Sequence, residues 1–165
     1  MTPVESDRPP MAAIIANPIK ADIPALKLAV EAAEAEAGFA PTLWLETTEG
    51  DAGQRAVGTA LRRGASVIAA AGGDGTVRAV AEGLRGSDVP LALLPSGTGN
   101  LLARNLELPL TSIEDEVAIL FGEHERIMDL GVVEIERKHG ESGGEHVFLV
   151  VAGIGIDAKM IKNTD

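Results

Sequence analysis

Two glycine-rich segments, GGDGT at 72–76 and SGTGN at 96–100, contain the residues of this sequence whose types and spacing could do chemistry. Each segment follows a short apolar run directly and precedes a stretch with helical spacing. Glycines allow a ligand to approach the backbone closely, and the first amides of a helix point free N–H groups at it. The pattern is typical of a phosphate site, and two such segments could hold adjoining phosphates.

The polar residues near these segments leave alternatives open. Asp74 and Thr76 could cap the helix that follows, with the glycines only shaping a turn. Alternatively, Asp74 orders the loop or helps to hold Mg²⁺, which is often bound through a single carboxylate beside substrate phosphates. Asn17, at the end of the first apolar run, either contacts a nucleotide or forms an Asn-Pro turn. Arg104 is either a phosphate ligand or an ordinary surface arginine.

The familiar nucleotide and hydrolase motifs do not match these segments. A GxGxxG fingerprint fails because Arg78 and Leu102 stand where the third glycine belongs, and no Gly-Lys-Ser/Thr of a Walker A loop occurs. Ser96 lacks the glycine two positions earlier that a nucleophile elbow needs. The residues therefore do not favour a Rossmann dehydrogenase, a P-loop enzyme or an α/β-hydrolase.

The elements around the glycine segments predict an α/β fold with a parallel sheet. Short runs that are apolar throughout alternate with amphipathic helical stretches, which is typical of parallel strands covered on both faces. Aromatic residues make up only 2% of the chain, so the core must consist of Ala, Val, Ile and Leu. The spacing of Thr111 and Glu114 predicts a capping box for the last helix. The strands are expected at 11–17, 41–47, 66–71 and 90–95, and the helices at 22–37, 50–64, 74–84, 101–106 and 111–121.

The pattern changes after residue 124. Two strand-like stretches, 126–138 and 145–157, are joined by a turn-rich segment and predict an antiparallel hairpin. We therefore expect a disordered arm at 1–10, an α/β domain at 11–124 and the beginning of a β-rich second domain at 125–165. Because a lone hairpin is marginally stable in water, the chain is expected to be truncated, with an open strand edge that allows self-association.

Composition excludes several classes of protein. The formal net charge of −11, from 14 basic and 25 acidic residues, argues against nonspecific nucleic-acid binding. The absence of cysteine excludes a disulfide scaffold and any thiolate metal site. The N-terminus has no signal-peptide pattern, and no apolar run reaches the roughly 18 residues of a membrane span. A cytoplasmic protein is expected.

Four motifs, taken in order, resemble the catalytic domain of the diacylglycerol kinase family, which includes bacterial lipid kinases and sphingosine kinases. GGDGT by itself is less specific, because NAD kinases carry it and phosphofructokinases have a related loop. The long second motif and the MDLG sequence at 128–131 make the resemblance more specific. The four motifs are NP at 17–18, GGDGT at 72–76, PSGTGNLLARNLELP at 95–109 and GIGIDA at 153–158.

The resemblance implies an ATP-binding α/β domain of the NAD kinase and phosphofructokinase type, followed by an antiparallel β-sandwich that binds lipid. It implies transfer of the γ-phosphoryl group of ATP, with Mg²⁺, to a diacylglycerol-like lipid hydroxyl by a cytoplasmic enzyme peripheral to the membrane. Asp74 would be the metal ligand. The residues implied in nucleotide binding are Asn17, Gly72, Gly73, Asp74, Gly75, Thr76, Gly97, Thr98 and Asn100.

One departure from the family limits what this chain is expected to do. The family's general base lies in a later motif, beyond residue 165, and neither Asp129 nor Asp157 matches it. We therefore expect the chain alone to bind nucleotide weakly and to have little or no kinase activity. Two alternatives are a small-molecule kinase of the NAD kinase type and a noncatalytic nucleotide-binding module. The sequence does not identify the acceptor lipid.

Overall fold

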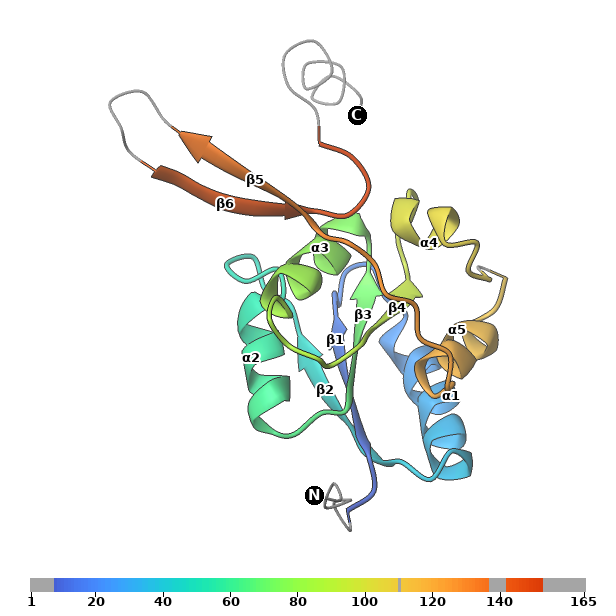
Figure 1. The fold of residues 1–165 in the computed structure, drawn as a ribbon. Coiled ribbons are helices and arrows are strands. Elements are labelled where there is room, and N and C mark those ends of the chain that lie inside the picture. Colours follow the sequence, from blue (N-terminus) through green and yellow to red (C-terminus); the bar gives the residue numbers. More distant parts are fainter. Residues whose placement is uncertain (1–7, 110, 137–141, 153–165) are drawn as a thin grey trace. The chain divides into compact units, whose positions relative to one another are not determined.

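The computed structural model describes residues 8–109, 111–136 and 142–152, which belong to two compact units. The units are Met1–Ile127 and Met128–Asp165 (Figure 1). The first is built of strands that alternate with helices, and the described part of the second contains two antiparallel strands. ATP binding by the domain expected at 11–124 and lipid binding by the one expected at 125–165 stay predictions.

The described part of the first unit contains four strands and five helices, joined mostly by short loops. They follow one another in the order β1 (Met11–Ala16), α1 (Ile23–Glu36), β2 (Ala40–Glu46), α2 (Gln54–Arg62), β3 (Val67–Gly72), α3 (Asp74–Gly83), β4 (Leu91–Pro95), α4 (Leu101–Asn105) and α5 (Ile113–Leu120).

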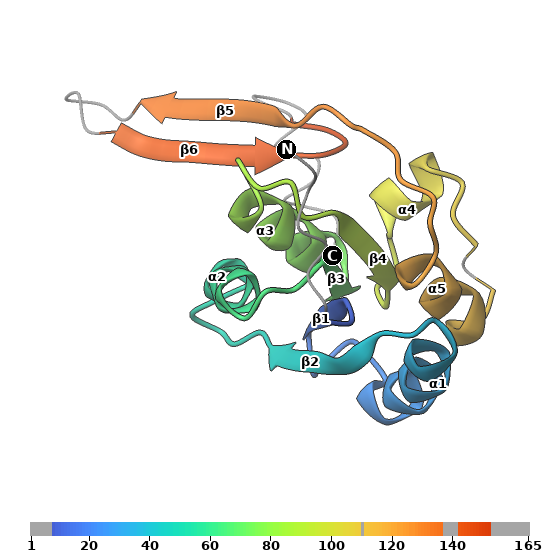
Figure 2. The ribbon, with the colours of Figure 1, turned by 60° about the horizontal axis from the view of Figure 1, so that its bottom comes forward.

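The four strands form one parallel sheet in the order β2-β1-β3-β4. Ile14 at the middle of β1 pairs with Trp44 of β2 on one side and with Ala69 of β3 on the other. Helices α1 and α5 lie over one face of the sheet and α2 and α3 over the other, as Figure 2 shows. The predicted α/β fold with a parallel sheet is confirmed.

Small aliphatic side chains fill the core, as the composition predicts. Every residue of β3 is buried, because both faces of this central strand are covered. Phe39 and Phe121 meet edge to face with ring centroids 5.0 Å apart, at the border of the layer under α1 and α5. The buried residues of that layer are Ala12, Ile14, Ala16, Ala21, Leu26, Val30, Val67, Ala69, Ala71, Ala92, Leu94, Val117 and Leu120.

In the first unit, most element boundaries lie within a few residues of their predicted positions, and the helix starts account for the main differences. Helix α1 begins where its pattern predicts, since the Asp22 side chain accepts a hydrogen bond from the amide of Ala25 at 3.1 Å. Helix α2 begins only at Gln54, because a turn joins Thr48 to Asp51 through the Thr48 amide and the Asp51 carbonyl, 2.9 Å apart.

The predicted capping box of α5 is wrong by one residue. Ser112, and not Thr111, is the cap, and its hydroxyl accepts a hydrogen bond from the Asp115 amide at 3.1 Å. Thr111 instead donates its hydroxyl to the Asp115 carboxylate at 2.9 Å. These two hydroxyls hold the pKa of Asp115 below its ordinary value. The sequence offers two adjacent hydroxyl residues, and the second is the cap.

The second unit contains the predicted hairpin. Strands β5 (Gly131–Glu136) and β6 (Ser142–Phe148) pair antiparallel, with Gly131 opposite Phe148. Gly131 has no room for a side chain, because the Phe148 ring lies against it. The start of an antiparallel sheet is thus confirmed, although both strands are shorter than predicted and β6 begins three residues early, inside the predicted turn. GIGIDA at 153–158 lies outside the described residues, and a complete sandwich and self-association through the strand edge stay predictions.

Within the described part of the chain, no helix has the length and apolar character needed to cross a membrane.

Glu116 makes the stability of the first unit depend on pH. Its side chain is buried beside Val117 on α5, and loss of hydration raises its pKa to about 7. The carboxyl of the unfolded chain has a pKa of 4.5, so the folded state binds the proton more tightly. Stability from this group is therefore full below pH 4.5 and is lost as the pH rises through 7.

We expect Glu116→Gln, which is neutral at every pH, to remove this loss. At pH 8 the variant should be more stable than the natural chain by about 1 to 2 kcal/mol, a value reduced for residual contact with water. Urea unfolding at pH 5 and pH 8 measures the difference. Glu114→Gln, at an exposed position of the same helix, is the control. Equal pH slopes for the natural chain and Glu116→Gln would contradict the prediction.

Candidate functional site

The candidate site lies at the carboxyl edge of the sheet, where the strand order changes direction. β1 is the neighbour of both β2 and β3, and the chain leaves β1 toward the face of α1 but leaves β3 toward the face of α3. Loops that diverge to opposite faces leave a crevice between them, and this is where open parallel sheets bind ligands.

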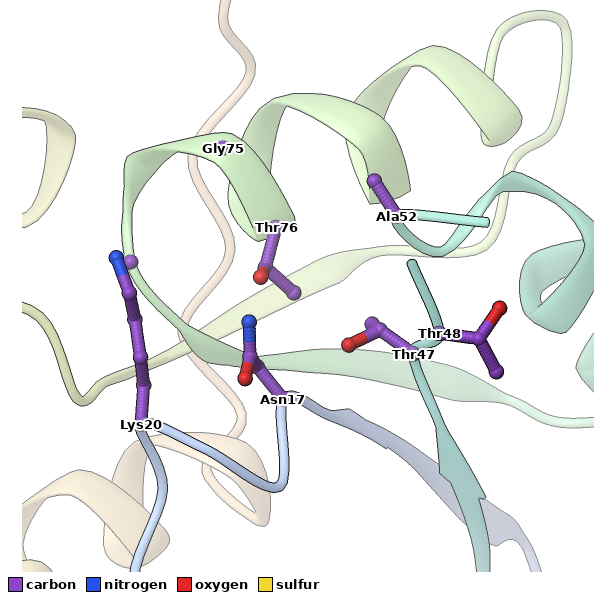
Figure 3. A pocket seen from close by; sticks show the side chains of 8 residues that line it. Asn17, Lys20, Thr47, Thr48, Ala52, Gly75 and Thr76 are labelled. Atoms are coloured by element: carbon purple, nitrogen blue, oxygen red, sulfur yellow. The ribbon is translucent and has the colours of Figure 1, made fainter. Parts of the chain in front are cut away.

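A pocket of about 200 Å³ occupies this position (Figure 3). The loops that follow β1, β2 and β3 all contribute to it. Its volume is below the roughly 300–1,000 Å³ of pockets that enclose a whole drug-sized ligand. It is therefore suited to part of a nucleotide, such as its phosphates. The lining residues are Asn17, Lys20, Thr47, Thr48, Ala52, Gly73, Gly75 and Thr76.

Asn17 shapes the loop after β1. Its backbone amide donates to the Ala71 carbonyl at 2.8 Å, and its side-chain Oδ1 accepts from the backbone amide of Ile19 at 3.0 Å. The Asn-Pro turn is therefore formed. The remaining group, Nδ2, has no hydrogen-bond partner among the described residues and points toward Thr76 in Figure 3. Asn17 can form the turn and still offer a donor to a ligand, so the two alternatives are compatible.

Lys20 supplies a positive charge from the same loop. Its side chain is exposed and extends toward the first turn of α3 in Figure 3. A Cβ atom added to Gly73 would lie 3.2 Å from its Nζ, so the ammonium group lies against the glycine segment. It has no ion-pair partner among the residues that the structure describes. The charge is available to an anion.

The first glycine segment presents free amides at the start of α3. The carbonyl of Gly73, the N-cap, accepts from the amides of Thr76 and Val77 at 3.0 and 3.1 Å. The amides of Asp74 and Gly75 precede the first intrahelical bond and remain available as donors. A Cβ atom at Gly75 would meet nothing within 4 Å, so the space beside this amide is open.

Asp74 faces away from the pocket, toward the second glycine segment. Its Oδ1 accepts a hydrogen bond from the Leu101 amide at 2.7 Å, across 27 residues of sequence. Asp74 thus caps α4. It does not cap α3, the helix that it begins, which was one of the two alternatives. Gly73 and Gly75, on either side of it, line the pocket, whereas Asp74 does not.

The second glycine segment is held by its own side chains and packs against the first. Asn100 donates from Nδ2 to the Gly97 carbonyl at 2.7 Å and accepts at Oδ1 from the Gly97 amide at 3.1 Å. Arg104 donates from Nε to the Gly99 carbonyl at 2.8 Å. A Cβ atom at Gly97 would lie only 2.8 Å from the Cα of Gly73. Arg104 therefore orders its own loop in this structure.

The structure brings four of the nine predicted nucleotide-binding residues into one pocket: Asn17, Gly73, Gly75 and Thr76. Gly72 lies behind it, and a Cβ atom there would be 2.6 Å from the Thr76 Oγ1. The other four do not line this pocket. Asp74, Gly97 and Asn100 make the contacts between and within the two segments, and Thr98 is exposed.

Sequence reasoning missed Lys20, Thr47, Thr48 and Ala52. Thr47 and Thr48 directly follow β2, and Figure 3 shows the Thr47 hydroxyl turned toward Asn17 while Thr48 points away. Their position directly after a predicted parallel strand could have identified them, because the carboxyl ends of parallel strands lie at the same edge of a sheet. Lys20 could have been found in the same way, three residues after the end of the first apolar run.

The pocket is suited to an anion. None of its eight lining residues is acidic, although the whole chain has a net charge of −11. It combines the Lys20 ammonium, the Asn17 Nδ2, two threonine hydroxyls and free amides at a helix N-terminus. In contrast, no group of three or more His, Cys, Asp or Glu residues able to hold a metal occurs in the described ranges. A metal role for Asp74 stays a prediction.

Comparison with known proteins identifies the family. The pattern of the diacylglycerol kinase catalytic domain matches residues 12–133. A Pseudomonas fluorescens protein named "Probable lipid kinase YegS-like" is 39% identical over 84% of this chain and 42% of its own length. A Mycobacterium tuberculosis protein named "Diacylglycerol kinase" is 31% identical over 69% of this chain and 36% of its own length.

A solved structure agrees with these sequence matches. The crystal structure of a diacylglycerol kinase from Bacillus anthracis has a TM-score of 0.56 to this chain at 26% identity, covering 84% of this chain and 50% of that one. The chain thus spans no more than about half the length of these relatives. With the family pattern covering most of its first unit and the parallel sheet in place, the chain belongs to the diacylglycerol kinase catalytic-domain family of lipid kinases.

Proposed function

We propose that the full-length protein is a lipid kinase that transfers the γ-phosphoryl group of ATP to the hydroxyl of a diacylglycerol-like lipid at a membrane surface. The observation that carries the proposal is the acid-free pocket at the start of α3, in a chain of this family. Nucleotide binding is the step that we assign to the residues of this chain.

In this proposal the phosphates of ATP occupy the pocket beside the first turn of α3. The amides of Asp74 and Gly75 donate to phosphate oxygens, and Lys20 neutralises part of their charge. Asn17 and Thr47 add polar contacts from the neighbouring loops. The second glycine segment closes the site through its contact with Gly73.

These residues would contribute to transfer mainly by positioning and charge neutralisation. Phosphoryl transfer passes through a loose transition state whose charge is spread over the phosphate oxygens, so fixed donors stabilise it without bond chemistry of their own. Bound Mg²⁺ would supply further neutralisation of the phosphates. No protein metal cluster is formed by the described residues, so we expect the ion to be held chiefly by the phosphates.

Lys20→Ala should weaken binding of Mg·ATP about tenfold, since a hydrogen bond to a charged group contributes about 1.5 kcal/mol. Isothermal calorimetry on this chain measures the dissociation constant, and the loss should shrink at high salt. Arg63→Ala, which removes one positive charge after the far end of α2, is the control. Equal affinities for Lys20→Ala and the natural chain would exclude Lys20 from the site.

Gly75→Ala should weaken ATP binding without lowering the stability of the fold. The added methyl group meets no protein atom within 4 Å, and alanine is the better helix former, so stability should hold or rise by about 0.5–1 kcal/mol. The methyl group would nevertheless occupy the space beside the phosphate-binding amides, and we expect at least a tenfold loss of ATP affinity. Gly58→Ala, in the middle of α2, is the control for a change of glycine to alanine in a helix away from the pocket, and its methyl group would lie 3.3 Å from the movable Arg62 Nη1. A Gly75→Ala chain that binds ATP normally would place the phosphates elsewhere.

The acceptor is tested with the full-length protein and γ-labelled ATP. We expect label on diacylglycerol presented in vesicles and none on NAD. Label on NAD would instead support a small-molecule kinase. Binding of ATP without transfer to either acceptor would support a noncatalytic module. We expect this chain by itself to bind ATP but to transfer little or no label.

A further inference from the structure

We propose that Asp74 is a positioning residue, whose carboxylate locks the second glycine segment (residues 96–100) onto the start of α3 and so sets the shape of the nucleotide site. The inference deepens the proposed function and rests on it where ATP affinity is concerned. The contact itself can be tested without any nucleotide.

The direction of the Asp74 side chain is the first argument. Gly73 and Gly75 line the pocket, but Asp74 between them does not. Its Oδ1 is 2.7 Å from the Leu101 amide nitrogen, and a Cβ atom on Gly99 would lie 2.7 Å from its Oδ2. One carboxylate oxygen thus lies against the second segment at Gly99, and the other accepts from Leu101, the residue that directly follows the segment.

The lack of a local cap on α4 is the second argument. This helix has five residues, and Asn100 at its N-cap position has a left-handed backbone (φ 48°) and makes no capping hydrogen bond with its side chain. The Asn100 side chain bonds Gly97 instead. A helix start without a cap leaves free amides, and a carboxylate there satisfies one of them and interacts favourably with the helix dipole. Asp74 supplies this cap from another element.

The close contact of the two backbones is the third argument. The Ser96 amide donates to the Gly72 carbonyl at 3.0 Å, and Gly97 packs directly on Gly73. The Asp74–Leu101 bond fixes the far end of the same segment. Displacing this end would loosen the packing of Gly97 on Gly73, which lines the pocket, and small displacements of binding groups cost much affinity.

The direction in which ATP affinity changes when the Asp74 carboxylate is removed distinguishes a positioning role from a simple charge effect. A carboxylate near phosphates repels them, so removing it would strengthen ATP binding if charge were its only influence. A loss of affinity in Asp74→Ala therefore requires either a lost contact within the protein or a lost metal ligand. Asn can still accept from the Leu101 amide but has no charge, so Asp74→Asn separates these two causes.

The experiment uses the ¹⁵N-labelled chain and three variants: Asp74→Ala, Asp74→Asn and Gly99→Ala. Gly99 does not have a positive φ, so alanine is compatible with its backbone, but its methyl group would push the carboxylate off Leu101. Hydrogen exchange of the Leu101 amide reports the contact. Calorimetry with ATP in Mg²⁺ and in EDTA reports the affinity. Asp88→Ala, at an exposed position, controls for the loss of one negative charge.

We expect Asp74→Ala and Gly99→Ala to speed Leu101 exchange at least tenfold and to weaken ATP binding about fivefold, with and without Mg²⁺. Asp74→Asn should recover most of both losses. An unchanged Leu101 amide in Asp74→Ala would overturn the proposal. The proposal would also fail if Asp74→Asn bound ATP as weakly as Asp74→Ala in Mg²⁺ but not in EDTA. That result would make Asp74 a metal ligand. A natural chain that binds no ATP in either buffer contradicts the assignment of nucleotide binding to this chain, and with it the effect of Asp74 on affinity, while Leu101 exchange still decides the contact.

Discussion

The parallel pairing of β1 with β3 is the constraint on which the candidate site depends. It places the ends of β1 and β3 side by side, and the helices that follow them lie on opposite faces of the sheet. The crevice between the two loops exists because parallel strands end at one edge and their connections must leave in different directions. Lys20 and the amides of α3 share this crevice although more than fifty residues separate them in sequence.

Small residues make this arrangement compact. The alanines of β3 let helices lie close on both faces, and the glycines after it let two loops meet backbone to backbone at Gly73 and Gly97. The glycines of the two segments have different roles. Gly75 opens space at the pocket, Gly72 accommodates the Thr76 side chain, and Gly97 and Gly99 make room for the first segment. A glycine-rich motif is therefore partly a packing motif.

The charge of the pocket lining differs in sign from the net charge of the chain. A net charge of −11 would disfavour an anionic ligand if it were spread evenly over the surface. The acidic residues are excluded from the pocket lining, and Asp74, which lies in the middle of the first segment, directs its carboxylate to the Leu101 amide. The charge that this edge presents thus depends on where a few groups point and not on the composition of the chain.

Periodicity and residue type predicted the α/β fold, the approximate position of each described helix and strand of the first unit, and the two glycine segments, whereas four motifs carried the resemblance to the family. These follow from local patterns, because amphipathic spacing and glycine content depend on neighbours in sequence. Only the tertiary structure decided that Asp74 caps α4 and that Lys20 and Thr47 join the pocket. A side chain has several partners within reach in an unfolded chain, and the packing of distant segments selects one of them.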